Sequence, residues 1–294
     1  MKKYIVVTGG AGFVGSNLVE YLVKKTNLKI ISIDNYSTGK KINHYKNPRV
    51  KYIKGYTKNI SSILKTKKNS IHSLFHFGEF ARIFQSFENM NECLNSNSIG
   101  TNAVFNFCLK NKIKLIYSAT SASLGNRGED KNLSPYAFTK AKNLELLENL
   151  RKWFNFKFEI IYFYNVYGPK QICKGPMATV VGIFEHYYKK GLPLPVVKPG
   201  TQSRRFTHID DTIKVCFEAW KRNQCKHYSI TNKDSFTIIE LAKLFNSKIK
   251  YLPSRKGERF ASALTSLNLS NKVYRRYGVI HLEDYVEKFI SSTS

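Results

Sequence analysis

Tyr136 and Lys140 are spaced in a way that permits acid–base chemistry. They lie four residues apart in SPYAFTK, directly after Pro135, so a helix that begins there places both side chains on one face. A free tyrosine has a pKa near 10 and needs a lowering of about 3 units to act as a base at neutral pH. A nearby ammonium group favours the phenolate and supplies part of that change. Because Tyr-x-x-x-Lys alone is common on solvated helices, its meaning depends on the residues around it.

A second candidate group lies upstream, in KLIYSATSASLG (residues 114–125). The pattern predicts a buried strand that runs into a turn of small residues. Ligands of open α/β sheets bind at the carboxyl ends of the strands. We therefore expect the Thr120 hydroxyl to bind a substrate oxygen, while Ser118, Ser121 and Ser123 are alternatives that could be simple turn residues.

The glycine-rich opening YIVVTGGAGFVGS, residues 4–16, predicts a strand, a tight turn and a helix. Gly9, Gly12 and Gly15 recur at three-residue spacing directly after a short apolar run. An amphipathic stretch follows, with apolar residues on one side: Leu18, Val19, Leu22 and Val23. The glycines would let the backbone approach a pyrophosphate, which the N–H groups of the helix N-terminus would face. An ordinary tight strand-to-helix turn is the alternative.

Asp34 favours the dinucleotide interpretation. It closes the next apolar run, KIISID, 19 residues after Gly15. A carboxylate at this point can accept hydrogen bonds from both ribose hydroxyls and would repel a 2′-phosphate. Together these residues predict a site for NAD rather than NADP.

The elements that must position these groups alternate along the first half of the chain. Strand-like runs at 4–8, 29–33, 50–54, 73–77 and 113–117 are mostly separated by helix-length segments, and a helix at 136–153 and a strand at 158–164 follow. This order predicts an α/β fold with a Rossmann-type, doubly wound parallel sheet. We predict an NAD-binding domain at 1–168, to which the chain returns near 205–232, and a smaller C-terminal α/β substrate lobe formed mainly by 169–294.

Composition limits the other possibilities. The chain has 294 residues, 42% of them hydrophobic, and no apolar run approaches the roughly 20 residues that span a bilayer. The first apolar run breaks at the glycines, so we expect neither export nor a membrane span. We therefore expect a cytoplasmic protein. The five cysteines form no CxxC pair and are odd in number, which is typical of reduced thiols rather than of disulfides or a metal site.

The formal net charge of +28 would suit a nucleic-acid-binding protein. The basic residues are spread along the chain, however, and Lys, Asn, Ile, Phe and Tyr are abundant together, which indicates a coding bias. We therefore expect no nucleic-acid partner. An anionic nucleotide substrate needs only a few of these charges.

Several motifs occur in an order that resembles one family nearly end to end. They are TGGAGFVGS, DNYSTG, HFGEFARIFQSFEN, Asn97 before Gly100-Thr101, YAFTK, NVYGPKQ, RRFTHIDD and RKGE. The chain resembles the extended short-chain dehydrogenases/reductases of the nucleotide-sugar epimerase/dehydratase family, of the UDP-glucose 4-epimerase type. These motifs are specific for the family and only weakly specific for the substrate.

The resemblance implies roles for individual residues. The cofactor NAD would be bound by Gly9, Gly12, Phe13, Val14, Gly15, Asp34, Asn35, Ser37, Thr38, Phe77, Gly78, Asn97, Tyr136 and Lys140. The catalytic triad would be Thr120, Tyr136 and Lys140. The phosphates and sugar of the substrate would be bound by Asn165, Arg204 and Arg255, and guanidinium groups pair well with diphosphate oxygens.

Four departures from the family pattern bear on specificity. Tyr56 stands where the family usually has an acid near adenine, so it could stack on the base, or NAD could bind more weakly. Glu79 departs from the usual HLAA motif and, with Arg82, adds charge near the substrate cleft. These two residues either contact the substrate or form a local surface pair. Leu124 and Arg205 also replace residues usual in the family, and could alter which sugar fits.

The residues after Thr120 separate subclasses of the family. Similar 4,6-dehydratases carry Asp-Glu there and related decarboxylases carry a glutamate, whereas Ser121 and Ala122 cannot transfer those protons. The chain is therefore predicted to be an NAD-dependent epimerase acting at C4 of a UDP-hexose.

The alternatives are a nucleotide-ketosugar reductase or other oxidoreductase and, after them, a dehydratase or a non-catalytic nucleotide-binding protein. Relatives with these motifs commonly serve polysaccharide synthesis. Many form homodimers, for which the candidate helices here are 86–110 and 136–153.

Overall fold

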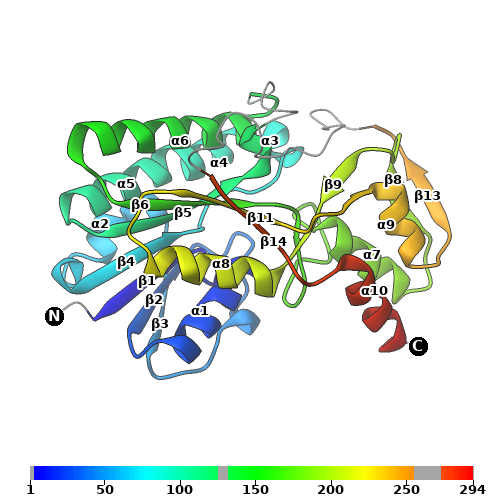
Figure 1. The fold of residues 1–294 in the computed structure, drawn as a ribbon, viewed down its shortest axis with the longest axis horizontal. Helices are drawn as coiled ribbons and strands as arrows, with labels where there is room; N and C mark the ends of the chain where they lie inside the picture. Colours follow the sequence, from blue (N-terminus) through cyan, green and yellow to red (C-terminus); the bar gives the residue numbers. More distant parts are fainter. Residues whose placement is uncertain (1–2, 125–131, 255–272, 294) are drawn as a thin grey trace.

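An eight-stranded parallel sheet forms the main body of the protein (Figure 1). The computed structural model describes residues 3–124, 132–254 and 273–293. The strand order is β14-β11-β6-β5-β4-β1-β2-β3. The strands are β1 (Tyr4–Thr8), β2 (Lys29–Asp34), β3 (Val50–Lys54), β4 (Ile71–His76), β5 (Lys114–Thr120), β6 (Phe158–Phe163), β11 (His227–Thr231) and β14 (Val273–Tyr277).

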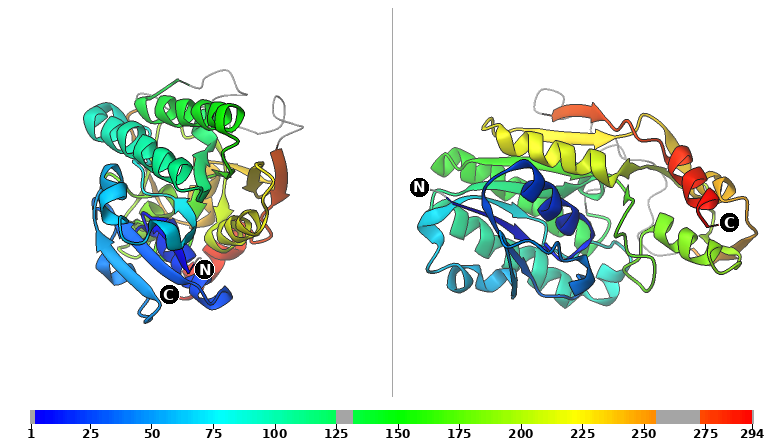
Figure 2. Two further views of the ribbon diagram at one scale, coloured as in Figure 1. Left: turned by 90° about the vertical axis from the view of Figure 1, so that its left-hand side faces the viewer. Right: turned by 90° about the horizontal axis from the view of Figure 1, so that it is seen from below.

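Helices cover both faces of this sheet, which confirms the doubly wound α/β fold predicted from the sequence. One face packs against α2 (Ile60–Ile63), α5 (Thr101–Lys110) and α6 (Pro135–Phe154), and the other against α1 (Phe13–Lys25) and α8 (Ile209–Lys221). The right-hand view of Figure 2 shows the α1 and α8 side. Because both faces are buried, strands such as β1 are continuous apolar runs rather than alternating ones.

The direction of winding reverses between β1 and β4, which are neighbours in the sheet but not in the chain. The loops that follow two such strands diverge to opposite faces and leave a crevice at their carboxyl ends. Gly9 follows β1 and Phe77 follows β4, so the predicted phosphate-binding turn lies at this switch point.

A smaller second cluster of elements lies beyond the carboxyl ends of the main strands (Figure 1). It contains α7 (Val180–Tyr188), β8 (Leu194–Val197), β9 (Ser203–Arg205), β12 (Ser235–Thr237), α9 (Ile238–Leu244), β13 (Ile249–Leu252) and α10 (Leu282–Ser291). Two short strands, β7 (Val166–Tyr167) and β10 (Thr207–His208), pair with each other. The main sheet includes β11 and β14, which both come after residue 168. The division into an NAD-binding domain at 1–168 and a substrate lobe at 169–294 stays a prediction.

The segment 86–110, expected as one helix, is instead divided. A short helix α3 (Gln85–Glu88) ends at Asn89, whose φ of −118° and ψ of 47° are not helical. The chain then continues as α4 (Met90–Leu94), a π-helical turn (Asn95–Gly100) and α5. At Gly100 an added Cβ would lie 2.3 Å from Thr57 Oγ1, so the π-helical turn packs directly against the residues after β3.

Candidate active site

A cleft of about 1290 Å³ opens at the carboxyl ends of the main strands and extends to the second cluster of elements. Most of the predicted site residues line it: Gly9, Gly12, Phe13, Val14, Gly15, Asp34, Asn35, Ser37, Thr38, Phe77, Gly78, Thr120, Tyr136, Lys140, Asn165 and Arg204. Arg255 lies outside the described residues. The structure thus brings together residues separated by almost 200 positions, whose individual roles stay predictions.

The turn after β1 is held by close backbone contacts that only glycine permits. Gly9 has a φ of +71°, and a Cβ there would lie 2.8 Å from the backbone of Phe77 and Gly78. A Cβ on Gly15 would lie 2.1 Å from the Gly9 carbonyl oxygen. Gly12, the N-cap of α1, makes no side-chain cap, so the first N–H groups of the helix stay open to an anion. This arrangement fits a pyrophosphate.

Asp34 is fixed at the end of β2 beside this turn. Its Oδ2 accepts a hydrogen bond from Ala11 N–H at 2.9 Å, and its Oδ1 accepts one from Tyr36 N–H at 2.8 Å. A Cβ on Gly39 would lie 2.8 Å from Oδ1. Each carboxylate oxygen keeps a further lone pair that can accept from a ribose hydroxyl. The residues present therefore fit the diphosphate and ribose of NAD.

Tyr56 lies at the end of the cleft expected to hold adenine. Its side chain lines the cleft and is 57% exposed. The Lys58 ammonium lies 5.7 Å from the centre of its ring. An open ring face at this place is compatible with stacking on a base, which stays a prediction.

Tyr136 and Lys140 project from the first two turns of α6. Ser134 is the N-cap of this helix and its Oγ accepts from Ala137 N–H at 3.1 Å, while Pro135 supplies a first residue with the required φ. The N–H of Tyr136 donates to Ser86 Oγ of α3 at 3.2 Å. Both Tyr136 and Lys140 are buried and both line the cleft, so this is not a solvated helix surface.

Thr120 ends β5 and starts a short 3-10 turn. Its Oγ1 accepts from Ala122 N–H at 3.2 Å, and its carbonyl oxygen accepts from Ser123 Oγ at 2.7 Å. The alternatives Ser118, Ser121 and Ser123 are all buried, and the first two line the cleft. Thr120 also lines the cleft, so its hydroxyl is available at the sheet edge.

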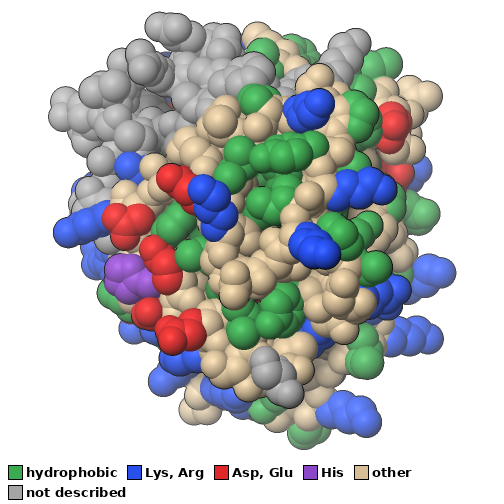
Figure 3. Space-filling model, turned by 90° about the vertical axis from the view of Figure 1, so that its right-hand side faces the viewer, with side chains coloured by type: hydrophobic (Ala, Val, Ile, Leu, Met, Phe, Trp, Pro, Cys, Tyr) green, Lys and Arg blue, Asp and Glu red, His purple; other side chains and the backbone are tan. Residues whose placement is uncertain are grey.

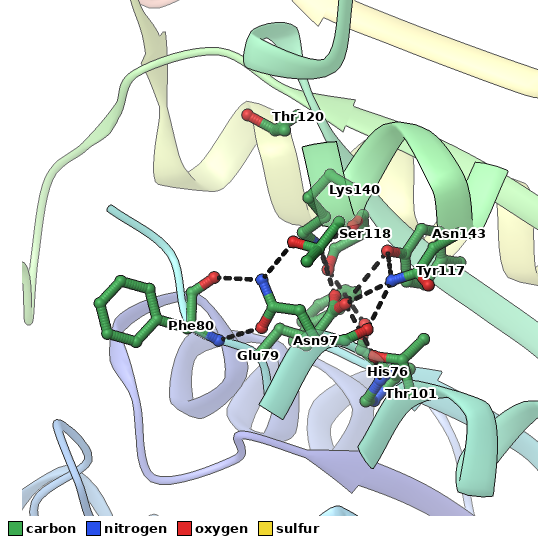
Figure 4. A network of polar contacts seen from close by, with 12 residues as sticks. His76, Glu79, Phe80, Asn97, Thr101, Tyr117, Ser118, Thr120, Lys140 and Asn143 are labelled. Carbon is green, nitrogen blue, oxygen red and sulfur yellow. Dashed lines mark hydrogen bonds and ion pairs between the residues drawn. The ribbon is translucent and has the colours of Figure 1, made fainter. Parts of the chain in front are cut away.

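Glu79 is bound to Lys140, which excludes the local Glu79–Arg82 surface pair that was one of the two alternatives. The Lys140 ammonium donates to Glu79 Oε2 and to the Ser118 carbonyl oxygen (Figure 4). The Glu79 side chain is 2% exposed and that of Lys140 is 4% exposed. Arg82 instead donates to the Met177 carbonyl oxygen, from Nε at 3.0 Å and from Nη2 at 2.5 Å.

The other Glu79 oxygen is also surrounded by donors. Oε1 accepts from Thr101 Oγ1 at 2.8 Å, Tyr117 OH at 3.1 Å and Asn143 Nδ2 at 3.3 Å. A carboxylate with this many donors can stay charged in the interior. Tyr117, Asn143 and the Thr101 hydroxyl are not among the site residues predicted from the sequence. Only Asn143 carries a local signal, because it follows Lys140 at a spacing that places both on one helix face.

His76 joins this network to the phosphate-binding turn. Its Nε2 lies 2.9 Å from Thr101 Oγ1, and its Nδ1 lies 2.7 Å from Oγ1 of Thr8, the residue before Gly9. Burial lowers the pKa of His76 to about 4, against a weaker raising effect of Glu79. The imidazole is therefore neutral at pH 7.

Asn97, predicted to contact the cofactor, is fully buried. Its Oδ1 accepts from Phe80 N–H at 2.7 Å, and its Nδ2 donates to Phe80 O at 3.0 Å (Figure 4). The Asn97 side chain therefore holds the backbone of the segment after β4 in place, and that segment lines the cleft.

The substrate side of the cleft carries Asn165 and Arg204. Asn165 Nδ2 donates to the Arg205 carbonyl oxygen at 2.7 Å, and Arg204 Nη1 donates to the Ser203 carbonyl oxygen at 2.8 Å. The Arg205 side chain donates to the carbonyl oxygens of Asn232 and Lys233. Arg205 therefore ties β9 to the loop after β11, and its effect on the sugar stays a prediction.

Within residues 3–124, 132–254 and 273–293, no helix is long and apolar enough to cross a membrane, and no group of three or more His, Cys, Asp or Glu side chains could hold a metal. On the face shown in Figure 3, Lys and Arg side chains are scattered rather than gathered in one stripe.

The fold and the cleft define an NAD-dependent enzyme of the extended short-chain dehydrogenase/reductase class. Residues 5–232 match the model of the NAD dependent epimerase/dehydratase family. The chain belongs to that family, which confirms the resemblance and the predicted cofactor.

Curated relatives align over most of both chains. The chain is 29% identical to a UDP-N-acetyl-alpha-D-glucosaminuronate decarboxylase of Bacillus cytotoxicus, over 87% of this chain and 85% of the relative. It is also 29% identical to an ADP-L-glycero-D-manno-heptose-6-epimerase of Brachyspira hyodysenteriae, over 84% and 81%.

Solved structures share the fold. UDP-glucose 4-epimerase of Thermotoga maritima superposes with a TM-score of 0.86 at 24% identity, over 98% of this chain and 97% of that one. UDP-N-acetylglucosamine 4-epimerase of Methanobrevibacter ruminantium superposes with a TM-score of 0.83 at 25% identity, over 100% and 98%. The relatives thus include epimerases and a decarboxylase, so the similarity alone does not single out one reaction.

Proposed function

We propose that this chain is a nucleotide-sugar epimerase that acts at C4 of a UDP-hexose. One observation carries the proposal: Thr120, Tyr136 and Lys140 line one cleft with the NAD-binding residues, and no acid directly follows Thr120. Ser121 and Ala122 occupy the places where elimination or decarboxylation would use a carboxylate, as the family pattern implies. The residues present are sufficient for a reaction in which only a hydride and one proton move.

The chain's own residues then have distinct tasks. Bound NAD supplies the acceptor and, later, the donor of a hydride. Tyr136, as phenolate, takes the proton of the sugar's 4-hydroxyl and returns it at the end. Thr120 orients that oxygen by a hydrogen bond, and Lys140 holds the nicotinamide ribose. Arg204, Asn165 and Arg255 hold the nucleotide diphosphate while the 4-keto sugar turns to present its other face.

A direct assay tests this proposal. The purified protein is denatured to identify any released nucleotide, and the native protein is incubated with UDP-, GDP- and dTDP-sugars whose products are separated by chromatography. We expect conversion of a UDP-hexose to its 4-epimer with no net change in absorbance at 340 nm. Stoichiometric loss of NADH would instead identify a reductase, and release of CO2 a decarboxylase.

Tyr136→Phe is the matched variant for this assay, with Tyr251→Phe on the exposed part of β13 as its control. Removing the proton-transfer group should lower turnover about 10²–10⁴-fold while NAD stays bound. Tyr251→Phe should behave like the wild type. Near-wild-type turnover of Tyr136→Phe would exclude the proposed mechanism.

We also propose a homodimer formed through the α4–α5 and α6 helices. Met90, Ile99 and Phe138 project exposed apolar side chains from these elements. Apolar side chains gathered on neighbouring helices are typical of an interface. Light scattering after gel filtration should give about twice the chain mass of 33.9 kDa, and Ile99→Glu should return it to the monomer mass.

A further inference from the structure

The buried Lys140–Glu79 pair changes the electrostatic environment of Tyr136. Lys140 follows Tyr136 by one helical turn, and its ammonium is bound by the carboxylate of Glu79. Neither side chain is more than 4% exposed, so water screens the two charges little. An ammonium alone beside a tyrosine hydroxyl favours the phenolate, whereas a closely bound ammonium–carboxylate pair has no net charge.

The pair is fixed in place and cannot easily separate. The Lys140 ammonium also donates to the Ser118 carbonyl oxygen at the end of β5 and lies 4.7 Å from the centre of the Tyr117 ring. Glu79 is held by Thr101, Tyr117 and Asn143 from three different elements. Because both partners have several further contacts, the carboxylate stays next to the ammonium.

Other charged and titratable groups face Tyr136 or the Lys140–Glu79 pair. Arg82, from the segment after β4, and Tyr117 of β5 interact with Tyr136 itself. His76 of β4 and Cys93 of α4 interact with the pair, and Glu92 of α4 lines the same cleft. Burial raises the pKa of Cys93 to about 11 and that of Tyr117 well above its usual value, and His76 is neutral. Glu92 is exposed at the rim of the cleft, where solvent screens it.

Arg82 is a further cation that lines the cleft and interacts with Tyr136. Burial lowers the pKa of its guanidinium, and the neighbouring Tyr136 hydroxyl opposes that effect. Its donors reach the carbonyl oxygens of Ala81 and Met177, and no described carboxylate pairs with it. Its positive charge is therefore not cancelled as that of Lys140 is.

We propose that Glu79 is a positioning residue that holds Lys140 and cancels its charge, so that Tyr136 loses its proton at a higher pH than Lys140 alone would permit. Arg82 then supplies the uncompensated positive charge beside the phenolate. This inference relies on the proposed function only for the use of Tyr136 as the base. If Glu79 served the packing of α6 alone, its charge would not affect the titration of Tyr136.

The test follows the Tyr136 hydroxyl directly, in the NAD-loaded protein labelled with ¹³Cζ-tyrosine. The NMR signal of Tyr136 is assigned by its loss in Tyr136→Phe and is titrated with pH. In Glu79→Gln the uncompensated Lys140 charge should lower the titration midpoint by about one pH unit. In the double variant Glu79→Gln/Lys140→Gln, which again has no net charge, the midpoint should return close to that of the wild type.

Two outcomes would overturn the proposal. One is a Tyr136 titration midpoint that is unchanged or raised in Glu79→Gln. The other is a midpoint raised by about one pH unit or more in the double variant. The second outcome would mean that Lys140 supports the phenolate despite its partner. Glu79→Asp keeps the charge and should stay near the wild type. Circular dichroism and urea unfolding establish that each variant is folded, and the double variant, which retains neither charge of the Lys140–Glu79 pair, decides the matter if Glu79→Gln does not fold.

No substrate is needed for this titration. A Tyr136 midpoint that moves as described supports the role of Glu79 even if no UDP-hexose is converted. Conversely, epimerase activity with an unchanged midpoint would retain the proposed function and exclude this role of Glu79.

Discussion

The two ends of the cleft are formed by different groups of the protein, backbone at one end and charged side chains at the other. At the phosphate end, the chain uses its backbone: three glycines pack against carbonyl and amide groups, and α1 begins with open N–H groups. At the catalytic end, side chains from four separate elements meet around Glu79 and Lys140. The first end depends on the absence of side-chain atoms, and the second on balanced buried charges. Substitutions should therefore affect the two ends through different physical causes.

Gly15→Ala, in the phosphate end, should have the largest effect on NAD binding. The new Cβ would lie 2.1 Å from Gly9 O and 2.9 Å from Gly10 Cα, and backbone atoms cannot move aside as a flexible side chain can. We expect NAD affinity to fall at least about 100-fold and the free energy of unfolding to fall by about 3 kcal/mol. Calorimetric titration with NAD and urea unfolding measure the two.

Gly191→Ala is the control for Gly15→Ala. Gly191 has a φ of +64°, but a Cβ there meets nothing within 4 Å. It should cost about 1 kcal/mol from backbone conformation alone and leave NAD binding unchanged. Equal effects of the two variants would mean that close packing does not distinguish the phosphate turn from an ordinary loop.

Lys140→Met tests the charge balance at the catalytic end. It leaves the carboxylate of Glu79 buried with no cation, and an uncompensated buried charge typically costs about 3–5 kcal/mol. Lys142→Met, on the same helix, breaks an exposed pair with Glu145 and should have no measurable effect. Urea unfolding of both variants at pH 7 provides the comparison.

A second substitution sharpens this result. Adding Glu79→Gln to Lys140→Met removes the unpaired charge and should restore much of the lost stability, because neutral partners can replace a buried pair at little cost. If the double variant were as unstable as the sum of both single losses, the network would act through its hydrogen bonds rather than through its charge balance.

The two ends also differ in how far the sequence predicts them. Gly9 and Gly15 follow β1 within a few residues and Asp34 ends β2, so their spacing in the sequence predicts the phosphate end. The alternation of strand-like and helix-length runs predicts the parallel sheet. Glu79 was identified as unusual, but its partners lie up to 64 positions away on α5, β5 and α6. Only the three-dimensional packing selects Lys140 over the nearby Arg82, since a charged residue gives no local signal of burial.

The same limit explains the divided segment 86–110. The resemblance implies one helix there, yet Asn89 leaves the helical region and the turn at Asn95–Gly100 widens to a π-helix. Asn97 in this turn is bound to the Phe80 backbone on both sides. Tertiary hydrogen bonds of this kind override a local helical preference and are invisible in the periodicity.

His76 connects the two ends of the cleft through Thr8 and Thr101, and its titration should make the stability of the protein depend on pH. Its pKa is lowered to about 4 in the folded protein by burial, against about 6.5 when unfolded. Between these values the unfolded chain binds more protons, so stability falls as the pH decreases from about 6.5 to about 4, by about 3 kcal/mol from this residue. Below about pH 4 the contribution of His76 no longer changes.

The measurement is the slope of the unfolding free energy against pH, compared between the wild type and His76→Gln. The slope between pH 4 and 6 should be smaller in the variant, whatever its absolute stability. Identical slopes would mean that His76 is already protonated in the folded protein, which would add a positive charge to the Thr8–Thr101 connection between the two ends.

Asp34→Asn, in the phosphate end, should have the smallest effect on NAD binding, because it changes one charge and little volume. The asparagine Oδ1 can still accept from Ala11 N–H or Tyr36 N–H, but its NH2 group cannot accept from the other. Losing one acceptor and the charge should weaken NAD binding about tenfold and reduce the preference over NADP, since a carboxylate repels a 2′-phosphate. Titrations with both dinucleotides measure the ratio, with Asp234→Asn, an exposed acid, as the control. A preserved ratio would mean that the backbone turn, and not the Asp34 charge, selects the cofactor, so that the phosphate end would depend on backbone geometry alone.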